Sequence, residues 1–305
     1  MDQKKYYAFA FTTVLMWSTS AALVKSLTAG LPSLCVLGWS SLFAVLFLLG
    51  LLAVRGQMGL FLRYGRREYG ALALLGFLGM FLYSALYYFG IQRLTSQEAC
   101  ILNYLWPVMI VLFSSLILKE PLAGRKVAAL AVSFSGVLVI ALYGMVTGGG
   151  TFSGDVPGIA ACILAAVCYG LFCVLNKKLD LDQTVGMVVF WSVTCLGAFS
   201  LCMVRGELAV PALPQLGGML WLGAAVHGVP YLLWAVALNG VTNTARIANL
   251  AYLTPVLSVM VSAATLGERL SAAYLAALAM ILLGIAVQNL GMDAARHSKR
   301  TFRRA

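Results

Sequence analysis

The segment Leu102–Val139 reads LNYLWPVMIVLFSSLILKEPLAGRKVAALAVSFSGVLV, and the segment Leu250–Val287 reads LAYLTPVLSVMVSAATLGERLSAAYLAALAMILLGIAV. Aligned without gaps at a shift of 148 positions, the two segments are identical at 16 of 38 positions. The identities include a proline in the first half of each segment, Pro107 and Pro255. Self-similarity at a fixed spacing over such a length indicates an internal duplication.

The composition excludes a water-soluble protein. Of the 305 residues, 62% are hydrophobic and only 10% are charged, whereas soluble domains have about 45–50% apolar and about 25% charged residues. Too little polar surface is left for a cytoplasmic enzyme, a secreted protein or a disordered chain. The net charge of +11 does not indicate nucleic acid as a partner, because the basic residues stand in short clusters between apolar runs, as topology signals do. The partner that it implies is the lipid bilayer.

Ten apolar runs are long enough to cross the hydrocarbon core as helices, which takes about 20 residues each. They cover residues 7–26, 33–54, 69–90, 97–118, 126–143, 157–176, 185–204, 216–237, 245–266 and 271–291. The seven cysteines lie in or beside these runs and form no CxxC pair. We interpret them as small buried hydrophobic side chains and expect no disulfide, metal site or cofactor. The sequence therefore predicts an all-α membrane protein with ten transmembrane helices.

The duplicated unit contains five predicted helices, and a weaker similarity between Trp17–Lys25 and Tyr169–Lys177 supports its extent. Because five is odd, the second copy enters the membrane from the opposite side, which gives a 5+5 inverted-topology repeat. Such repeats are typical of transporters whose substrate site lies near the midplane between the halves. The predicted organisation is a first repeat over 1–143, an external Gly-rich linker over 144–155, a second repeat over 156–291 and a basic cytoplasmic tail over 292–305.

The basic residues also orient the chain. With ten spans and the N-terminus inside, 17 Lys and Arg residues fall on the cytoplasmic side and four on the other side. The four are Lys25, Arg93, Arg205 and Arg269. Since short cytoplasmic loops carry the excess of Lys and Arg, we predict that both termini are cytoplasmic.

At this point the residues resemble a known family. A proline in the fourth and ninth helices, each followed by a Leu-x-Glu end (Leu118–Glu120 and Leu266–Glu268), is similar to the drug/metabolite transporter superfamily, EamA type. Three strings resemble its branch of YddG-type aromatic amino-acid exporters: Trp17-Ser18-Thr19, Asn103-Tyr104-Leu105-Trp106-Pro107 and Tyr252-Leu253-Thr254-Pro255-Val256-Leu257-Ser258. Cys168-Tyr169 departs from the Trp that relatives commonly have there. The resemblance implies a multi-pass protein of a bacterial inner membrane, with helices 1–4 and 6–9 around the cavity and helices 5 and 10 as outer supports.

The prolines are the first candidates for a mechanical role. Pro107 and Pro255 lie mid-span, and each frees the carbonyl four residues earlier and bends the helix there. They could be static packing kinks, but the same residue at the same depth in both halves favours a pair of hinges. Pro230, in the eighth helix, is a third candidate hinge.

Polar and aromatic side chains inside the spans are the candidates for substrate binding. Asn103 and Trp106 share one face of the fourth helix, and an amide in hydrocarbon needs a partner or a water-filled cavity. Their repeat equivalents are Ala251 and Thr254, which predicts an asymmetric pocket. His227 is the one titratable side chain that we place near the middle of a span, where it serves substrate contact or proton coupling, or is a neutral residue bonded to a backbone carbonyl.

Six further aromatic side chains supply large ring surfaces that could line a cavity, pack helices or face the lipid interface. They are Trp17, Tyr83, Tyr87, Tyr169, Trp234 and Tyr252. By contrast, we expect Glu120 and Glu268 to be structural, capping the following helix or pairing with Arg125 and Arg269.

These features predict a secondary transporter, an exporter or facilitator of aromatic or other large neutral amino acids that works by alternating access. The alternatives are an exporter of a different metabolite or drug-like amine and, more remotely, a membrane-embedded lipid-modifying enzyme, which would need a cluster of acids or histidines. The expected partners are a small-molecule substrate and lipid, with monomer and homodimer both open.

The predicted topology can be tested by single-cysteine labelling in a cysteine-free background. We expect a cysteine at residue 150 to react with an impermeant maleimide from outside, and cysteines in 55–68, 119–125 and 177–184 to react from the cytoplasm. Labelling of residue 150 from the cytoplasmic side alone would reverse the orientation.

Overall fold

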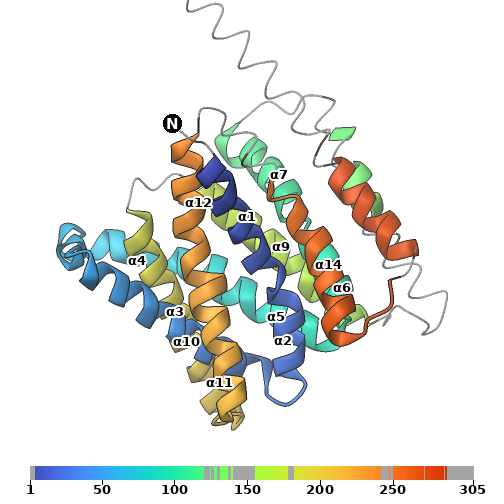
Figure 1. Ribbon diagram of the computed structural model, residues 1–305. Coiled ribbons are helices and arrows are strands. Elements are labelled where there is room, and N and C mark those ends of the chain that lie inside the picture. Colours follow the sequence, from blue (N-terminus) through green and yellow to red (C-terminus); the bar gives the residue numbers. More distant parts are fainter. Residues whose placement is uncertain are drawn as a thin grey trace, which may run out of the picture.

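The computed structural model describes residues 4–119, 124, 127–128, 131–136, 139, 155–177, 182–241, 247, 250–270, 272–284 and 286. Within these residues every regular element is helical and no strand occurs. The helices form a bundle in which elements from the two halves of the sequence alternate in space (Figure 1).

Several of the spans are built from two or three helical pieces that follow one another. The first half comprises α1 (Lys4–Ser18), α2 (Ser20–Thr28), α3 (Ser33–Val54), the 3-10 helix η1 (Met58–Arg63), α4 (Arg66–Gly76), the π-helical turn η2 (Phe77–Leu82), α5 (Tyr83–Arg93), α6 (Ser96–Asn103) and α7 (Trp106–Leu118). The second half comprises α9 (Val156–Asn176), α10 (Gln183–Arg205), α11 (Leu213–Leu220), the π-helical turn η3 (Trp221–Gly228), α12 (Val229–Gly240) and α14 (Leu253–Leu266).

Seven helical stretches are long and apolar enough to cross a membrane. They coincide with predicted spans one to four and six to eight, and they make this a multi-pass membrane protein. Two shorter apolar helices, Leu253–Leu266 and Ala272–Gly284, lie in predicted spans nine and ten. Half of predicted span five, all but the last residue of the Gly-rich linker and the whole basic tail lie outside the described residues, so the count of ten remains a prediction.

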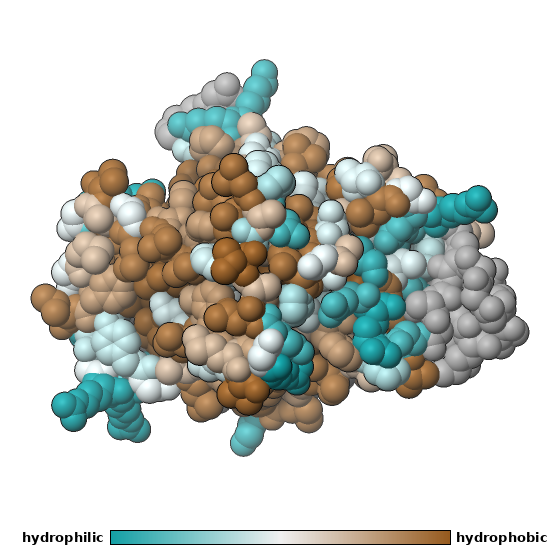
Figure 2. Space-filling model, turned by 90° about the horizontal axis from the view of Figure 1, so that it is seen from below, coloured by the Kyte–Doolittle hydropathy of each residue, from teal (hydrophilic) through white to brown (hydrophobic). Residues whose placement is uncertain are grey.

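The outside of the bundle is apolar, as a protein in contact with lipid tails requires. Leu74, Leu196 and Met260 expose 70%, 69% and 57% of their surface. Figure 2 shows hydrophobic residues over most of the face seen from below, with hydrophilic residues gathered toward its edges. A soluble protein exposes contiguous apolar patches of this kind only at interaction sites.

The two halves pack through each other. The long helices α3 and α10 lie against one another, α5 packs on α9, and α1 packs on α12 (Figure 1). In each pair one helix comes from the first half and the other from the second half. The largest buried core cluster consequently joins residues of both halves, from Val24 in α2 to Val259 in α14.

The start of α9 is fixed by a charged pair at its N-terminus. Asp155 accepts a hydrogen bond from the backbone N–H of Gly158 at 2.7 Å, as an N-cap does. The same carboxylate binds the Arg93 guanidinium through two hydrogen bonds of 2.8 and 2.7 Å. Hydrogen bonding to this guanidinium lowers the pKa of the Asp155 carboxyl below its ordinary value. The pair joins the end of α5 to the beginning of α9.

One glycine is required by close approach of two backbones. A Cβ atom on Gly223, in η3, would lie 2.5 Å from the Ser40 carbonyl oxygen and 2.7 Å from the Ala44 nitrogen of α3. Any side chain at residue 223 therefore has to separate η3 from α3. Gly217, one turn and a half earlier in the same span, has nothing within 4 Å of such an atom.

We expect Gly223→Ala to lower the melting temperature of the detergent-purified protein by about 2–5 °C, because overpacking of a core contact costs about 1–3 kcal/mol. Gly217→Ala is the matched control and should be neutral or slightly stabilising, since alanine favours a helix over glycine. Equal melting temperatures for the two variants would contradict the backbone contact.

Candidate functional site

A cavity of about 350 Å³ lies between the two halves of the bundle. Its walls come from seven of the nine apolar stretches of helix, and most of the lining side chains are aromatic or small and polar. They are Trp17, Ser20, Ala21, Met80, Tyr83, Ser84, Tyr87, Tyr88, Cys100, Asn103, Tyr104, Trp106, Tyr169, Trp191, Val226, His227, Tyr231, Trp234, Ala251, Thr254 and Ser258.

The backbone is interrupted where the fourth and ninth spans pass the cavity. α6 ends at Asn103 and α7 begins at Trp106, so that Pro107 lies in the first turn of a new helix. The ninth span has the same arrangement, because a turn at Ala251 and Tyr252 precedes α14 and its Pro255. The freed Ala251 carbonyl accepts hydrogen bonds from the Tyr104 hydroxyl at 2.6 Å and from the Thr254 N–H at 3.1 Å. A side chain from the opposite half thus satisfies the group that the proline leaves without its helical partner.

Two wide π-helical turns border the same cavity. η2 contributes Met80, and η3 contributes Val226 and His227. Pro230 follows η3 directly, in the first turn of α12, where the missing N–H of proline costs little. π-helical turns inside longer helices are frequently found at functional sites. The hinge role of Pro230 stays a prediction.

Tyr169 of α9 is the centre of a group of rings on one wall. Its ring centroid lies 4.8 Å from that of Tyr83 and 5.4 Å from that of Trp106, which it meets edge to face at 86°. On another wall, Trp17 lies 5.4 Å from Trp234 and 6.1 Å from Tyr231. These distances are in the range in which aromatic pairs attract each other, so the rings hold one another in place around the cavity.

Of the two polar groups of the Asn103 amide, only the NH2 group has a hydrogen-bond partner within the described residues. Its Nδ2 donates to the Tyr83 hydroxyl at 3.2 Å, while its buried Oδ1 has no partner there. The buried Oγ1 of Thr254 and the buried Nε1 of Trp191 are likewise without partners. A buried polar group left unpaired costs about 1–3 kcal/mol, and all three groups belong to residues that line the cavity.

His227 is buried between an aromatic ring and a hydroxyl group. Its ring stacks on Trp191 with centroids 4.0 Å apart, and its Nε2 lies 3.4 Å from the Tyr88 hydroxyl oxygen. The partner is therefore a side chain from α5 rather than the backbone carbonyl considered from sequence.

Nine of the ten residues proposed from sequence for substrate binding line this one cavity, and they come from both halves. The tenth, Tyr252, lies in the turn before α14 and does not line it.

The cavity wall carries no formal charge among its described residues, which include no Asp, Glu, Lys or Arg. The described part of the chain also holds no group of three His, Cys, Asp or Glu residues able to bind a metal ion. Such a cavity can offer ring faces and neutral hydrogen-bonding groups, and it leaves an unbalanced charge on a solute without an ionic partner.

The comparison with known families agrees with this picture. The model of the EamA-like transporter family matches the chain twice, over residues 4–142 and 156–290. The chain belongs to the EamA-like transporter family. It is therefore a membrane transporter and not an enzyme.

Relatives of this EamA-like transporter include proteins that export amino acids. It is 27% identical over 302 residues to the aromatic amino acid exporter YddG of Ancylobacter novellus, covering 95% of this chain and 99% of that protein. It is 26% identical over 260 residues to a probable terminal-alkyne amino-acid exporter of Streptantibioticus cattleyicolor, covering 84% of each. A protein of known crystal structure matches with a TM-score of 0.66 and 26% identity, over 94% of this chain and 97% of that one.

Sequence reasoning missed several residues of the cavity wall, notably Tyr88, Trp191 and Tyr231. The sequence repeat could have pointed to Trp191. The pair Trp191-Ser192 matches the pair Trp39-Ser40 at a shift of 152 positions, the same shift that relates Trp17 to Tyr169. The two tryptophans nevertheless have different surroundings. Trp39 packs on Phe199 and donates to the Ala209 carbonyl at 3.3 Å, away from the cavity.

Proposed function

We propose that this EamA-like transporter exports, or facilitates the passage of, aromatic and other large neutral amino acids by alternating access through the cavity between its halves. The observation that carries this proposal is a cavity walled by aromatic rings whose described lining has no formal charge. A zwitterion with an apolar side chain suits such walls, because its net charge is zero and its side chain gains contact with the rings.

The ring-bearing wall would hold the substrate side chain. The ring centroid of Tyr169 lies 4.8 Å from that of Tyr83 and 5.4 Å from that of Trp106. Each well-placed aromatic pair contributes about 0.5–1.5 kcal/mol beyond the area that it buries. A few such contacts give weak binding, which favours release on the far side of the membrane and a broad range of accepted side chains.

The unpaired polar groups would receive the two charged ends of the amino acid. Asn103 Oδ1 and Thr254 Oγ1 can accept hydrogen bonds from an ammonium group, and the indole N–H of Trp191 can donate one to a carboxylate. None of the three has a partner within the described residues. A substrate that pairs with these groups offsets the cost of leaving them without hydrogen bonds. A phosphorylated sugar or a nucleotide would instead bring charge that these groups cannot neutralise.

Alternating access fits an inverted repeat of five plus five helices, in which one half rocks against the other around a central site. Three observations support this arrangement: the duplicated sequence, the two matches of the family model and the packing of each first-half helix on a second-half helix. The orientation that we propose has both termini in the cytoplasm of a bacterial cell with the transporter in its inner membrane.

The aromatic faces also favour a second class of solute, drug-like amines, because a cation can bind the face of a tryptophan or tyrosine ring. Such an amine would lack the carboxylate that the Trp191 N–H is proposed to receive. Comparison of an amino acid with its decarboxylated amine therefore separates the two classes.

Efflux from proteoliposomes tests the substrate class. We expect phenylalanine and tryptophan to leave faster than threonine, and a sugar phosphate to be retained. Trp106→Ala should raise the phenylalanine concentration needed for half-maximal flux about tenfold, since it removes ring contacts of about 0.5–1.5 kcal/mol each.

Phe11→Ala is the control, because this phenylalanine is 44% exposed on the outside of the bundle and does not line the cavity. Transport of the sugar phosphate without any amino acid would refute the substrate class. An unchanged phenylalanine dependence in Trp106→Ala would refute the site.

The paired prolines can be tested separately from the substrate. Pro107→Ala and Pro255→Ala each supply an N–H group that lets the helix continue across the break, so we expect normal insertion but slower exchange between inward-open and outward-open states. Pro157→Ala is the matched control, because Pro157 is also in the first turn of a helix but is exposed and distant from the cavity lining. Wild-type exchange rates in both cavity variants would leave the prolines with a packing role alone.

A further inference from the structure

Glu268 binds the N-terminus of a helix in the other half of the protein. Its carboxylate accepts hydrogen bonds from the backbone N–H of Ser96 at 2.7 Å, the hydroxyl of Ser96 at 2.9 Å and the backbone N–H of Gln97 at 3.1 Å. The Gln97 side chain donates back to the Glu268 carbonyl at 3.2 Å. The expectation that Glu268 caps the following helix or pairs with Arg269 is wrong, because its partner is α6 and the described residues contain no such ion pair.

The connection between α5 and α6 is held from other sides as well. The Lys25 ammonium of α2 donates to the carbonyls of Ile91, Gln92 and Leu94, at 2.9, 3.0 and 2.6 Å. A cation thus binds the C-terminus of α5, and an anion binds the N-terminus of α6. In both places the sign of the charge is the one that the helix dipole favours.

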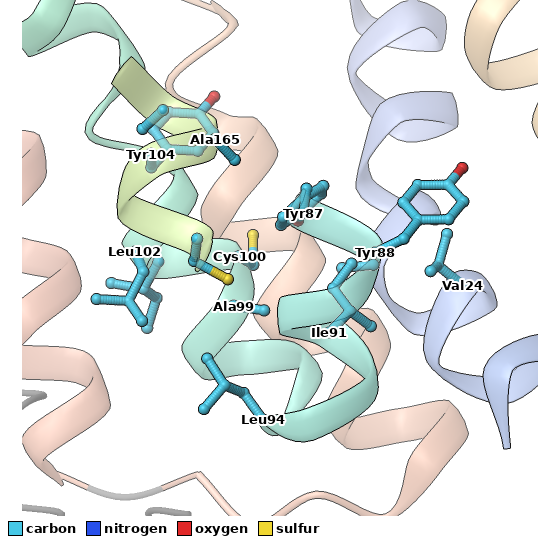
Figure 3. Close-up of a cluster of buried hydrophobic side chains, with 14 of the residues drawn as sticks. Val24, Tyr87, Tyr88, Ile91, Leu94, Ala99, Cys100, Leu102, Tyr104 and Ala165 are labelled. Carbon is cyan, nitrogen blue, oxygen red and sulfur yellow. The ribbon is translucent and has the colours of Figure 1, made fainter. Parts of the chain in front are cut away.

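The start of α6 is shielded from water. Ser96 and Gln97 are fully buried, and Glu98 is 1% exposed. Apolar side chains pack behind them, and Figure 3 shows Ile91 of α5 and Leu94, directly after α5, lying close to Ala99 of α6. A path that opens beside this contact has to separate α6 from these neighbours.

α6 also connects this contact to the cavity. Cys100 and Asn103, on the same short helix, line the cavity wall. Directly after α6, the Tyr104 hydroxyl binds the Ala251 carbonyl at 2.6 Å, just before α14 begins. Since Glu268 follows the end of α14, α6 is tied to the ninth span at both ends.

The inverted repeat supplies the same parts a second time. Glu120 precedes Glu268 by 148 positions and ends an identical Leu-x-Glu string, and Thr244 stands at the position equivalent to Ser96 with a hydroxyl of its own. Both residues lie outside the described part of the chain.

We propose that Glu268 and the N-terminus of α6 form a latch that holds the cavity shut at one end, external in the predicted orientation. The inference rests on the proposed alternating access. It adds the charge-assisted contact that has to break when the cavity opens at this end.

Accessibility of Cys100 measures the latch without any substrate. The other six cysteines are replaced by alanine, and an impermeant maleimide is applied to each side of sealed vesicles in turn. Glu268→Ala removes hydrogen bonds to a charged group, so we expect Cys100 to react about tenfold faster from the Glu268 end. Glu268→Gln, which keeps one acceptor oxygen, should give a smaller increase, and labelling from the opposite end should stay unchanged.

Glu207→Gln is the matched control, because this residue lies in another loop predicted on the same side and has no part in the latch. Labelling of Glu268→Ala at the wild-type rate, or equally faster labelling from both ends, would overturn the proposal. If Glu268→Ala does not fold, Ser96→Ala is the decisive variant, because it removes one hydrogen bond and leaves the Glu268 carboxylate in place. About threefold faster labelling supports the latch, and an unchanged rate refutes it. Faster labelling without any amino-acid flux would keep the latch and refute only the substrate class.

Discussion

Every peptide group inside a bilayer has to find a hydrogen-bond partner within the protein, and the architecture of this chain follows from that requirement. An unpaired N–H or C=O group in hydrocarbon costs several kcal/mol, so the described spans are helical over most of their length. The informative places are those where a helix stops. At three of them a side chain from elsewhere in the chain replaces the missing backbone partner: Tyr104 at the Ala251 carbonyl, Lys25 at the end of α5 and Glu268 at the start of α6.

These replacement partners join the two halves into one structure. Tyr104 belongs to the first half and Ala251 to the second, while Glu268 of the second half binds Ser96 of the first. The interruptions that open room for a cavity are therefore the same places that connect the halves. A movement of one half against the other has to exchange such partners rather than lose them, because a lost partner would leave a peptide group unpaired in an apolar surrounding.

Much of this could be predicted from the sequence, and the parts that could not have a common physical reason. Periodic and compositional signals located the seven long spans, the breaks before Pro107 and Pro255 and most of the aromatic wall, because these features depend on residues close together in the chain. The partner of Glu268 stands 172 positions away, and that of His227 stands 139 positions away. Local spacing carries no information on such pairs, and the repeat misleads where equivalent positions differ, as they do for Trp39 and Trp191.

The π-helical turn η3 has a geometrical consequence for the cavity. A π-helical turn accommodates one residue more than an α-helical turn, so it shifts everything after it by one place, or about 100° around the helix axis. Tyr231 and Trp234 follow this turn, and Met219 precedes it and is fully buried in the core. The extra residue therefore sets how far the second part of the span, which faces the cavity, is rotated about the helix axis relative to the first part, which packs in the core. Loss of a single residue within Trp221–Gly228 would turn the rings of α12 toward a different neighbour while leaving the composition of the wall almost unchanged.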